Sequence, residues 1–495
     1  MKVPKIPDPI VIFIGLYLVA FVCSVVFGGT VFQGPDGGEL CIRSMATVEN
    51  VRWAVSNCLI RNWVAYAHGM LPIVFVVMMG IGVAEQGGLF SAMLRLLGRC
   101  VNGKSLAYLV VGAGILSNVA SDAGYLVLIP LAATLYATVG RSPLVGIAAG
   151  FAGVSAGFGA NLIPATPNDV VIGVNTLQFA EQMGVPTVSY LGRDLCAPTM
   201  DYYYMSTLFV LFTLLGGFVT NRIVEPRLGR LPWTRPDDFS VGAFELTDDE
   251  RGGLRWGVAG LAVALVVSAL FACFPLAPYV DEVGRRHTPF MDNVIVFVSF
   301  SFFLSGIAYG WRVGKYRTAR DVIAAASRQL GGCGYLAVLT FVSFNFLAMF
   351  NHSGLAAWIA CSGARGLLAL DLGTSPCLLL IVFIVFGALV NCFISSLSAK
   401  WMLLGPVFVP MLYGACHELT PEVVTAAYRT ADPSTNVLTP VMTFAGVVLV
   451  FCRKWKADFS LGDQIAMMLP YSALFLPAST LLLIAWFKLS LPFGF

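Results

Sequence analysis

The chain has 495 residues, of which 58% are hydrophobic and only 12% are charged, and its formal net charge is +3. An ordinary soluble domain carries about a quarter charged residues, so this composition excludes one. No basic region of the kind that binds nucleic acid is present, and the apolar residues form continuous runs instead of the alternating pattern of barrel strands. Because backbone groups in lipid must be satisfied within their own segment, these runs predict an all-α polytopic membrane protein.

Roughly nine to eleven apolar segments approach the ~20 residues that span the hydrocarbon core. The clearest of them are residues 10–27, 256–274, 293–310 and 467–487. The first lacks a small-residue cleavage site followed by a soluble domain. It is therefore predicted to be the first membrane span and not a signal peptide.

Basic residues gather in four polar regions, which the positive-inside rule places in the cytoplasm. These regions hold Lys2 and Lys5; Arg95, Arg99 and Lys104; Arg312, Lys315, Arg317, Arg320 and Arg328; and Arg453, Lys454 and Lys456. The rule predicts a cytoplasmic N-terminus and an odd number of full crossings, with any re-entrant hairpins not counted. The location expected for this multi-pass protein is the bacterial inner membrane.

The polar loop at residues 28–62 then lies outside, where Cys41 and Cys58 either form a disulfide or remain two thiols. The 12 cysteines include no C-x-x-C pair and no histidine at ligand spacing. Neither a metal site nor a cofactor is predicted.

The chain divides near its middle. Residues 222–255 are polar and rich in proline and acidic residues, which is typical of a cytoplasmic linker between a first membrane half (residues 1–221) and a second (residues 256–495). Each half contains a region where apolar stretches are interrupted by Gly, Pro, Asn, Ser and Asp, near residues 117–174 and 391–451.

The two interrupted regions match in order and spacing. The corresponding positions are Pro130 and Pro410, Pro143 and Pro421, and Asn161-Leu-Ile-Pro164 and Asn436-Val-Leu-Thr-Pro440. Corresponding broken helices in two halves are typical of transporters built as inverted repeats around a site at the membrane midplane. Chance recurrence of Pro and Asn is the alternative.

Polar residues within these regions are candidates for function because they are costly in a membrane. Arg429 and Asp432 are three residues apart, so on a helix they share a face and could pair. Pro433 is predicted to break that helix, with Ser434 to Asn436 adding further polar groups. Such a pair offers a fixed cation for an anionic substrate and a carboxylate for a coupling ion, or it only holds the helix break together.

The first half offers a comparable set. Asp169 follows Pro167-Asn168 and is either a coupling residue or a helix N-cap. Asn118, Ser121 and Asp122 suit an unwound helix tip that ligates an ion or a substrate, or a polar interface between packed helices.

A matching cluster in the second half contains Asn391, Ser398, Lys400 and Trp401. Ser398 and Trp401 are three apart and face the same way on a helix, so the indole could stack on an aromatic substrate. The alternatives are an interfacial belt position for Trp401 and an outward-snorkelling Lys400 with no role.

Motifs for other chemistry are not supported. Gly153-Val-Ser155-Ala-Gly157 fits the G-x-S-x-G pattern of hydrolases, but it lies in an apolar segment where close helix packing explains it better. The sequence has no P-loop, no H-E-x-x-H motif and no shared spacing among its four histidines. An ion gradient is therefore the expected energy source.

These segments resemble the AbgT family of p-aminobenzoyl-glutamate transporters. The resemblance covers most of the chain and is carried by Met79-Gly-Ile-Gly-Val-Ala-Glu85 with Gly88-Leu89; Ser117-Asn-Val-Ala-Ser-Asp-Ala-Gly-Tyr125 continuing to Ile129-Pro130-Leu131-Ala132; Asn221-Arg-Ile-Val-Glu-Pro-Arg-Leu-Gly229; Ser398-Ala-Lys-Trp401; and Tyr428-Arg-Thr-Ala-Asp432 with Ser434-Thr-Asn436.

The resemblance implies a homodimer whose subunits have nine transmembrane helices and two re-entrant hairpins. It implies uptake of p-aminobenzoyl-glutamate or export of sulfonamide antimetabolites, linked to the proton-motive force. The functional positions that it implies are Asp169, Asn391, Ser398, Trp401, Pro421, Arg429, Asp432 and Pro440. The chain departs from the family pattern at Asp201-Tyr202, where Asn-Trp is more usual, and in the proline-rich residues 163–168.

The sequence therefore predicts a secondary transporter that works by alternating access on a small anionic substrate, with H⁺ or Na⁺ as the coupling ion and membrane lipid around it. The predicted substrate-binding residues are Asn391, Ser398, Trp401, Arg429, Asn161 and Asn436. The predicted coupling-ion residues are Asp432, Asp169, Asp122 and Asn118, and the predicted helix breaks are at Pro164, Pro421, Pro433 and Pro440. A sodium-coupled dicarboxylate carrier, an intramembrane enzyme acting on lipid or peptide, and a passive channel are the alternatives, and the direction of transport stays open.

Overall fold

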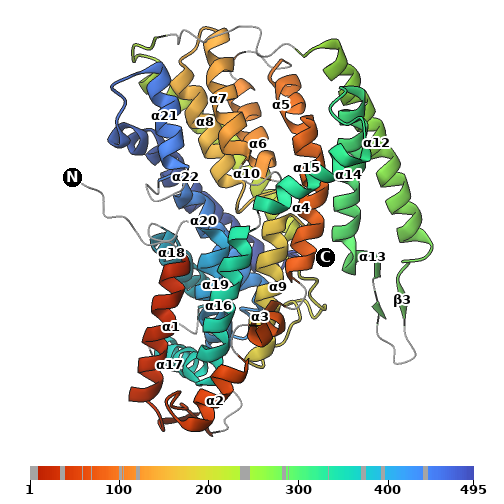
Figure 1. The fold of residues 1–495 in the computed structure, drawn as a ribbon. Coiled ribbons are helices and arrows are strands. Elements are labelled where there is room, and N and C mark those ends of the chain that lie inside the picture. The colour runs from red at the N-terminus through yellow and green to blue at the C-terminus, as the bar shows by residue number, and fades with distance from the viewer. Residues whose placement is uncertain are drawn as a thin grey trace.

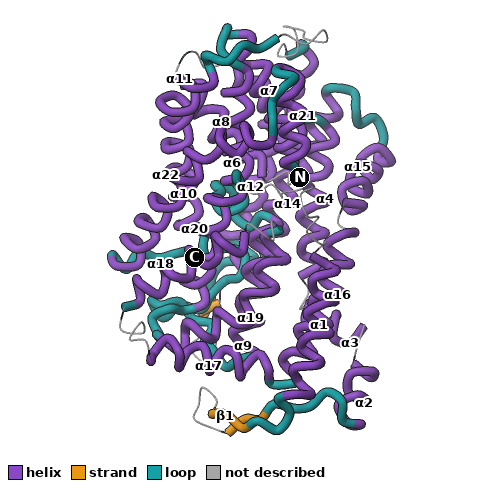
Figure 2. The backbone as a smooth tube through the Cα atoms, turned by 90° about the vertical axis from the view of Figure 1, so that its left-hand side faces the viewer, coloured by secondary structure: helices purple, strands orange, loops and turns teal. Residues whose placement is uncertain are grey.

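The computed structural model describes residues 9–33, 39–57, 60–67, 70–99, 103, 105–118, 123–234, 246–280, 286–287, 289–332, 334–369, 375–391, 396–438 and 444–495. Helices make up almost all of the regular structure in these residues. The short strands among them form two antiparallel pairs. Figure 2 shows helices running through the whole height of the molecule, so the predicted all-α fold is confirmed.

The N-terminal elements lie at one end of the molecule, drawn at the bottom of Figure 1. They are α1 (Pro9–Val26), β1 (Val31–Gln33), β2 (Glu39–Cys41), α2 (Val48–Asn57) and α3 (Ile60–Ala67). The strand pair sets Phe32 opposite Leu40. Cys41 is exposed and forms no disulfide among the described residues. Cys58, the other cysteine of the disulfide that the sequence leaves open, lies outside these residues.

The rest of the first half is helical. Its elements are α4 (Met70–Gly87), α5 (Leu89–Arg99), α6 (Ser105–Ser117), α7 (Ala123–Thr138), α8 (Pro143–Ala156), α9 (Pro167–Gln182), α10 (Tyr202–Val219), the π-helical turn η2 (Thr220–Val224) and α11 (Glu225–Leu228).

The second half contains the remaining elements. They are α12 (Asp248–Cys273), β3 (Tyr279–Val280), β4 (Arg286–His287), α13 (Pro289–Asp292), α14 (Val294–Arg312), α15 (Ala319–Gly332), α16 (Gly334–His352), α17 (Leu355–Ala369), α18 (Pro376–Asn391), α19 (Leu397–Ala415), α20 (Pro421–Asn436), α21 (Ala445–Trp455) and α22 (Leu461–Lys488). Helix covers both ends of the predicted linker at 222–255, so the segment between α11 and α12 is residues 229–247.

Five helical stretches among the described residues are long and apolar enough to cross a membrane. They are Tyr202–Leu228, Asp248–Cys273, Val294–Arg312, Ala319–His352 and Leu461–Lys488. Only 22% of the apolar window of Asp248–Cys273 is buried within the chain, so most of α12 presents apolar side chains outward, as a lipid-facing helix does. In Figure 1, α12 and α14 stand together at one side of the molecule.

Small residues bring α6 and α8 close together. A Cβ added to Gly153 would lie 2.4 Å from the carbonyl oxygen of Val111, and one added to Gly114 would lie 2.8 Å from the Cα of Gly153. Every residue of α8 is buried. The interpretation of the G-x-S-x-G pattern as a helix-packing surface therefore agrees with the structure.

The two interrupted regions contain corresponding helices in the same order. In the first, α6 ends at Ser117 and α7 begins at Ala123; in the second, α18 ends at Asn391 and α19 begins at Leu397. The next helix is α8 in the first region and α20 in the second. These helices begin at Pro143 and Pro421, the two prolines that the sequence comparison matched, and each packs against the two helices before it. Both α8 and α20 are enclosed by the protein.

Candidate functional site

The most polar helix in the interior is α20, which contacts α8, α9, α18, α19 and α22. Every one of its residues is buried, including Arg429 and Asp432. Ionised groups are expensive to enclose unless they are paired and hydrogen-bonded. The partners of these two residues therefore define the site.

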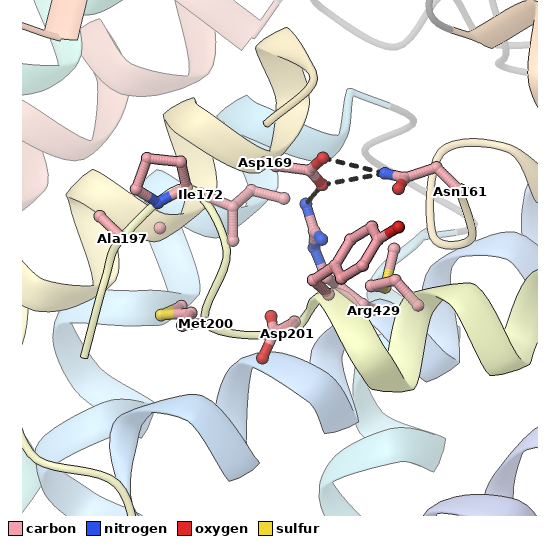
Figure 3. A pocket seen from close by; sticks show the side chains of 11 residues that line it. Asn161, Asp169, Ile172, Ala197, Met200, Asp201 and Arg429 are labelled. Carbon is pink, nitrogen blue, oxygen red and sulfur yellow. Dashed lines mark hydrogen bonds and ion pairs between the residues drawn. The ribbon is translucent and has the colours of Figure 1, made fainter. Parts of the chain in front are cut away.

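Arg429 reaches from the second half to the first. The residue is 2% exposed, and its Nη2 donates a hydrogen bond of 2.6 Å to Oδ1 of Asp169 on α9 (Figure 3). Asn161 Nδ2 donates to both carboxylate oxygens of Asp169, at 3.1 and 2.9 Å. The predicted Arg429–Asp432 pair is therefore wrong, because the arginine turns toward α9 and its ion pair joins the two halves.

Asp169 also stabilises the start of its own helix. The N-cap of α9 is Thr166, and Asp169 is the third helical residue. Its Oδ2 accepts hydrogen bonds from the backbone N–H of Thr166 at 2.9 Å and from its hydroxyl at 2.7 Å. The predicted N-cap thus belongs to Thr166, while Asp169 completes a capping box and pairs with Arg429 at the same time.

Asp432 pairs with Lys400 of α19, and both side chains are fully buried. The lysine ammonium also donates to Oδ1 of Asn391, and Asn436 Nδ2 donates to the second oxygen of Asp432 at 2.6 Å. Asn391 Nδ2 in turn donates to Oδ1 of Asn436 at 2.8 Å and to Thr435 Oγ1 at 2.8 Å. The prediction of an outward-snorkelling Lys400 is therefore wrong, since this lysine is the counter-charge of a buried aspartate.

Trp401 lies in the interior beside this pair. It is fully buried, its indole N–H donates to Thr176 Oγ1 of α9 at 2.9 Å, and its ring lies 4.5 Å from that of Tyr428. It is not an interfacial belt residue. Ser398, three residues earlier in the first turn of α19, is half-buried. Stacking of Trp401 on a substrate would require these helices to separate.

The predicted helix breaks have mixed outcomes. Pro164 lies in the turn before Ala165, whose φ is +58°, and Pro421 is the first residue of α20. Pro433 does not break α20, which continues to Asn436. Instead, Pro433 supplies no N–H to the carbonyl of Arg429, four residues earlier. Pro440 lies outside the described residues.

The turn after α8 fits against this proline. A Cβ added to Gly159 would lie 2.1 Å from Cγ of Pro433 and 2.4 Å from the carbonyl oxygen of Arg429. Only glycine leaves room for this contact. The first-half loop that carries Asn161 is therefore packed directly on the backbone that carries Arg429.

Asn118 follows the end of α6, where it is buried and accepts a hydrogen bond of 3.1 Å from Asn168 Nδ2 through its Oδ1. Its own Nδ2 has no hydrogen-bond partner among the described residues. Ser121 and Asp122 lie outside the described residues. The structure thus places Asn118 near the start of α9.

A small cavity opens beside the Arg429–Asp169 pair (Figure 3). Its volume of about 10 Å³ leaves room for no more than one water molecule. Among the lining residues are Asn161, Asp169, Asp201 and Arg429. In this conformation an aromatic substrate does not fit there.

Asp201 is a site residue that the sequence reasoning did not select. It is 4% exposed and stands at the N-cap position of α10, but its side chain makes no capping hydrogen bond. Its Oδ1 has no hydrogen-bond partner among the described residues. The sequence signals were its position directly before an apolar run and its departure from the family pattern.

The whole chain, residues 3–495, matches the model of the AbgT putative transporter family. The chain belongs to the AbgT family. It is 30% identical over 502 residues to the p-aminobenzoyl-glutamate transport protein of Escherichia coli strain K12, with 99% of this chain and 94% of that protein covered.

Two solved AbgT structures are similar to this one. The YdaH transporter of Alcanivorax borkumensis superposes with a TM-score of 0.88 at 33% identity, covering 99% of this chain and 100% of that chain. MtrF of Neisseria gonorrhoeae, described as illuminating a class of antimetabolite efflux pumps, superposes with a TM-score of 0.86 at 32% identity, covering 98% and 96%. The AbgT chain is thus a membrane-embedded, multi-span transporter, and the intramembrane-enzyme alternative is dropped.

Proposed function

We propose that this AbgT protein is a secondary active transporter of p-aminobenzoyl-glutamate or a related aromatic, folate-derived anion. Export of sulfonamides is the alternative form of this activity. We propose that transport is coupled to protons. The observation that carries this proposal is the buried ion pair between Arg429 and Asp169, which joins the two halves. The names of the E. coli relative and of MtrF support the substrate class.

The pair provides a physical route to coupling. A substrate carboxylate that takes the Nη2 donor of Arg429 replaces Asp169, and an aspartate left charged and unpaired in the interior costs several kcal/mol. Protonation of Asp169 removes that cost. Binding of the anion and binding of a proton therefore favour each other.

The second buried pair extends the site. Asp432 with Lys400 gives a second carboxylate that could take the coupling proton, and Asn118 and Asp122 remain candidates in the first half. When α9, α19 and α20 separate, Trp401 would meet the aromatic ring of the substrate. The side chains of Asn161, Asn391, Ser398 and Asn436 would hydrogen-bond to its polar groups.

The architecture belongs to the same proposal. Halves at residues 1–221 and 256–495, joined by 222–255, would form an inverted repeat of nine transmembrane helices and two re-entrant hairpins, assembled as a homodimer. The helices α6–α8 and α18–α20 follow one another in the same order, which supports the repeat. The basic clusters support an inner-membrane location with a cytoplasmic N-terminus.

Uptake of labelled p-aminobenzoyl-glutamate into proteoliposomes tests the proposal. We expect accumulation that requires an imposed proton gradient, persists when choline replaces sodium, and is lost in Arg429→Ala and Asp169→Asn. The matched control is Asp249→Asn, which alters an exposed ion pair with Arg312. Uptake that depends on sodium and ignores the proton gradient would instead support the sodium-coupled carrier, and no uptake by folded protein would refute the proposed substrate.

A further inference from the structure

Asp201 is an acidic side chain without a visible role in holding the fold together. No ion pair is formed by it among the described residues, and its Oδ1 is enclosed without a hydrogen-bond partner there. A buried ionised carboxylate in this condition is strongly disfavoured. Either a cation must approach it or it must carry a proton.

Arg429 lines the same cavity and also has an unused donor. Its Nη2 bonds to Asp169, whereas its Nε is buried without a partner among the described residues. Figure 3 shows the Asp201 carboxylate on the opposite side of the Arg429 side chain from Asp169. One guanidinium and two carboxylates thus line the same cavity, and the guanidinium bonds to only one of them.

The neighbouring elements add few other charges. Arg429 and Asp169 both act electrostatically on Asp201, and Asp201 acts in turn on Glu422 at the start of α20 and on Tyr204 of α10. Glu422 is held by the backbone N–H of Tyr190, which donates to its Oε1 at 3.1 Å. Arg429 is therefore the only cation among the described groups that act on Asp201.

We propose that Asp201 is a proton-binding carboxylate of the transport site and the alternative partner of Arg429. When Arg429 bonds to Asp169, the proton resides on Asp201. When the proton moves to Asp169, the guanidinium turns to Asp201. One proton and one guanidinium neutralise two carboxylates in either arrangement, so no unpaired charge is left in the interior.

A proton suits this cavity better than a metal cation does. The cavity has room for one water at most, and a hard cation would need several oxygen ligands. The guanidinium of Arg429 also lines the cavity and would repel a second cation. A single water could bridge the two carboxylates and carry the proton between them.

The role in transport rests on the proposed function, but proton occupancy can be measured without a substrate. The first experiment is a pH titration of the purified full-length protein in liposomes, followed by infrared difference spectroscopy of the carbonyl stretch of protonated carboxylic acids. We expect the wild type to show a protonated-acid band near neutral pH that is lost in Asp201→Asn and restored in Asp201→Glu. Asp249→Asn, an exposed carboxylate, should change only signals at acidic pH.

Size-exclusion elution and circular dichroism would establish that each variant is folded. A neutral-pH band that is unchanged in folded Asp201→Asn would overturn the proposal. If Asp201→Asn does not fold, the test is Asp201→Glu. The longer acid should keep the band but shift its titration midpoint relative to the wild type. A band and midpoint identical to those of the wild type would overturn the assignment.

Transport gives the second readout. We expect Asp201→Asn to lose the change in uptake rate between about pH 6 and about pH 8, across which the wild type responds. A variant with an unaltered pH profile contradicts the role in transport. If the wild type moves no p-aminobenzoyl-glutamate at all, the proposed substrate fails while the infrared result still decides whether Asp201 binds the proton.

Discussion

Replacing Asp432 with asparagine removes the counter-charge of a fully buried lysine. The Lys400 ammonium has Asp432 as its ion-pair partner, and Asn391 is a neutral acceptor beside it. Removing one partner of a buried ion pair costs about 3–5 kcal/mol. An independent upper bound follows from the reference pKa of lysine, about 10.4, since giving up that proton at pH 7 costs about 5 kcal/mol. We expect Asp432→Asn to lower the free energy of unfolding by about 3–5 kcal/mol at pH 7.

The same reasoning predicts a pH trend. If the cost reaches the upper bound of about 5 kcal/mol, Lys400 is neutral in the folded variant and protonated in the unfolded chain. The unfolded state then binds more protons, so the stability of the variant rises with pH. The penalty relative to wild type should shrink to about 2 kcal/mol at about pH 9, because each pH unit is worth about 1.4 kcal/mol.

Unfolding by SDS in mixed micelles, followed by tryptophan fluorescence, measures this effect. The cycle compares the wild type, Asp432→Asn, Lys400→Met and the double variant, which should recover part of the loss because it removes both charges. The control Asp249→Asn alters an exposed pair with Arg312 and should cost less than about 1 kcal/mol. A loss below about 1 kcal/mol in Asp432→Asn would refute the idea that Asp432 neutralises Lys400.

Three further outcomes are expected. Arg429→Lys should reduce uptake at least about tenfold at unchanged expression, because an ammonium lacks the planar fork that exchanges one carboxylate for another; wild-type uptake would contradict this. Gly159→Ala should destabilise the protein by about 1–3 kcal/mol in the SDS assay, because its Cβ would lie 2.4 Å from the Arg429 carbonyl oxygen. Gly366→Ala is the control, because it adds a methyl group in open space. Equal effects of the two substitutions would contradict the packing argument. Thr176→Val should cost about 1–3 kcal/mol by leaving the buried indole N–H of Trp401 without its acceptor, and an unchanged midpoint would mean that the indole finds another partner.

The interior combines two ion pairs that differ in reach. Lys400–Asp432 connects neighbouring helices of the second half, whereas Arg429–Asp169 connects the two halves. A change in how the halves pack must therefore strain or break the second pair, while the first can move with its own half. Under the proposed function, this difference would make Arg429–Asp169 the contact that responds to alternating access.

Much of this protein is readable from its sequence, and the reasons are local. Long apolar runs must be helices in lipid, so the all-α class follows from composition and run length alone. Polar residues in such runs are costly, so the sequence alone indicates Asp169, Arg429, Asp432 and Asn391 as candidates. Prolines also have local meaning at helix starts, as Pro421 shows at the first residue of α20.

Pairing was decided only by the tertiary structure. Spacing of three residues predicted an Arg429–Asp432 pair, yet each found a partner on another helix, because packing against α9 and α19 supplied Asp169 and Lys400. Periodicity could not distinguish a snorkelling lysine from a buried one, since both lie in apolar surroundings along the chain. The sequence did not indicate Asp201 as a site residue for the same reason. Asp201 shares a cavity with Arg429, which is more than 200 residues away in sequence. Contacts at such separations depend on how helices pack and not on any local pattern.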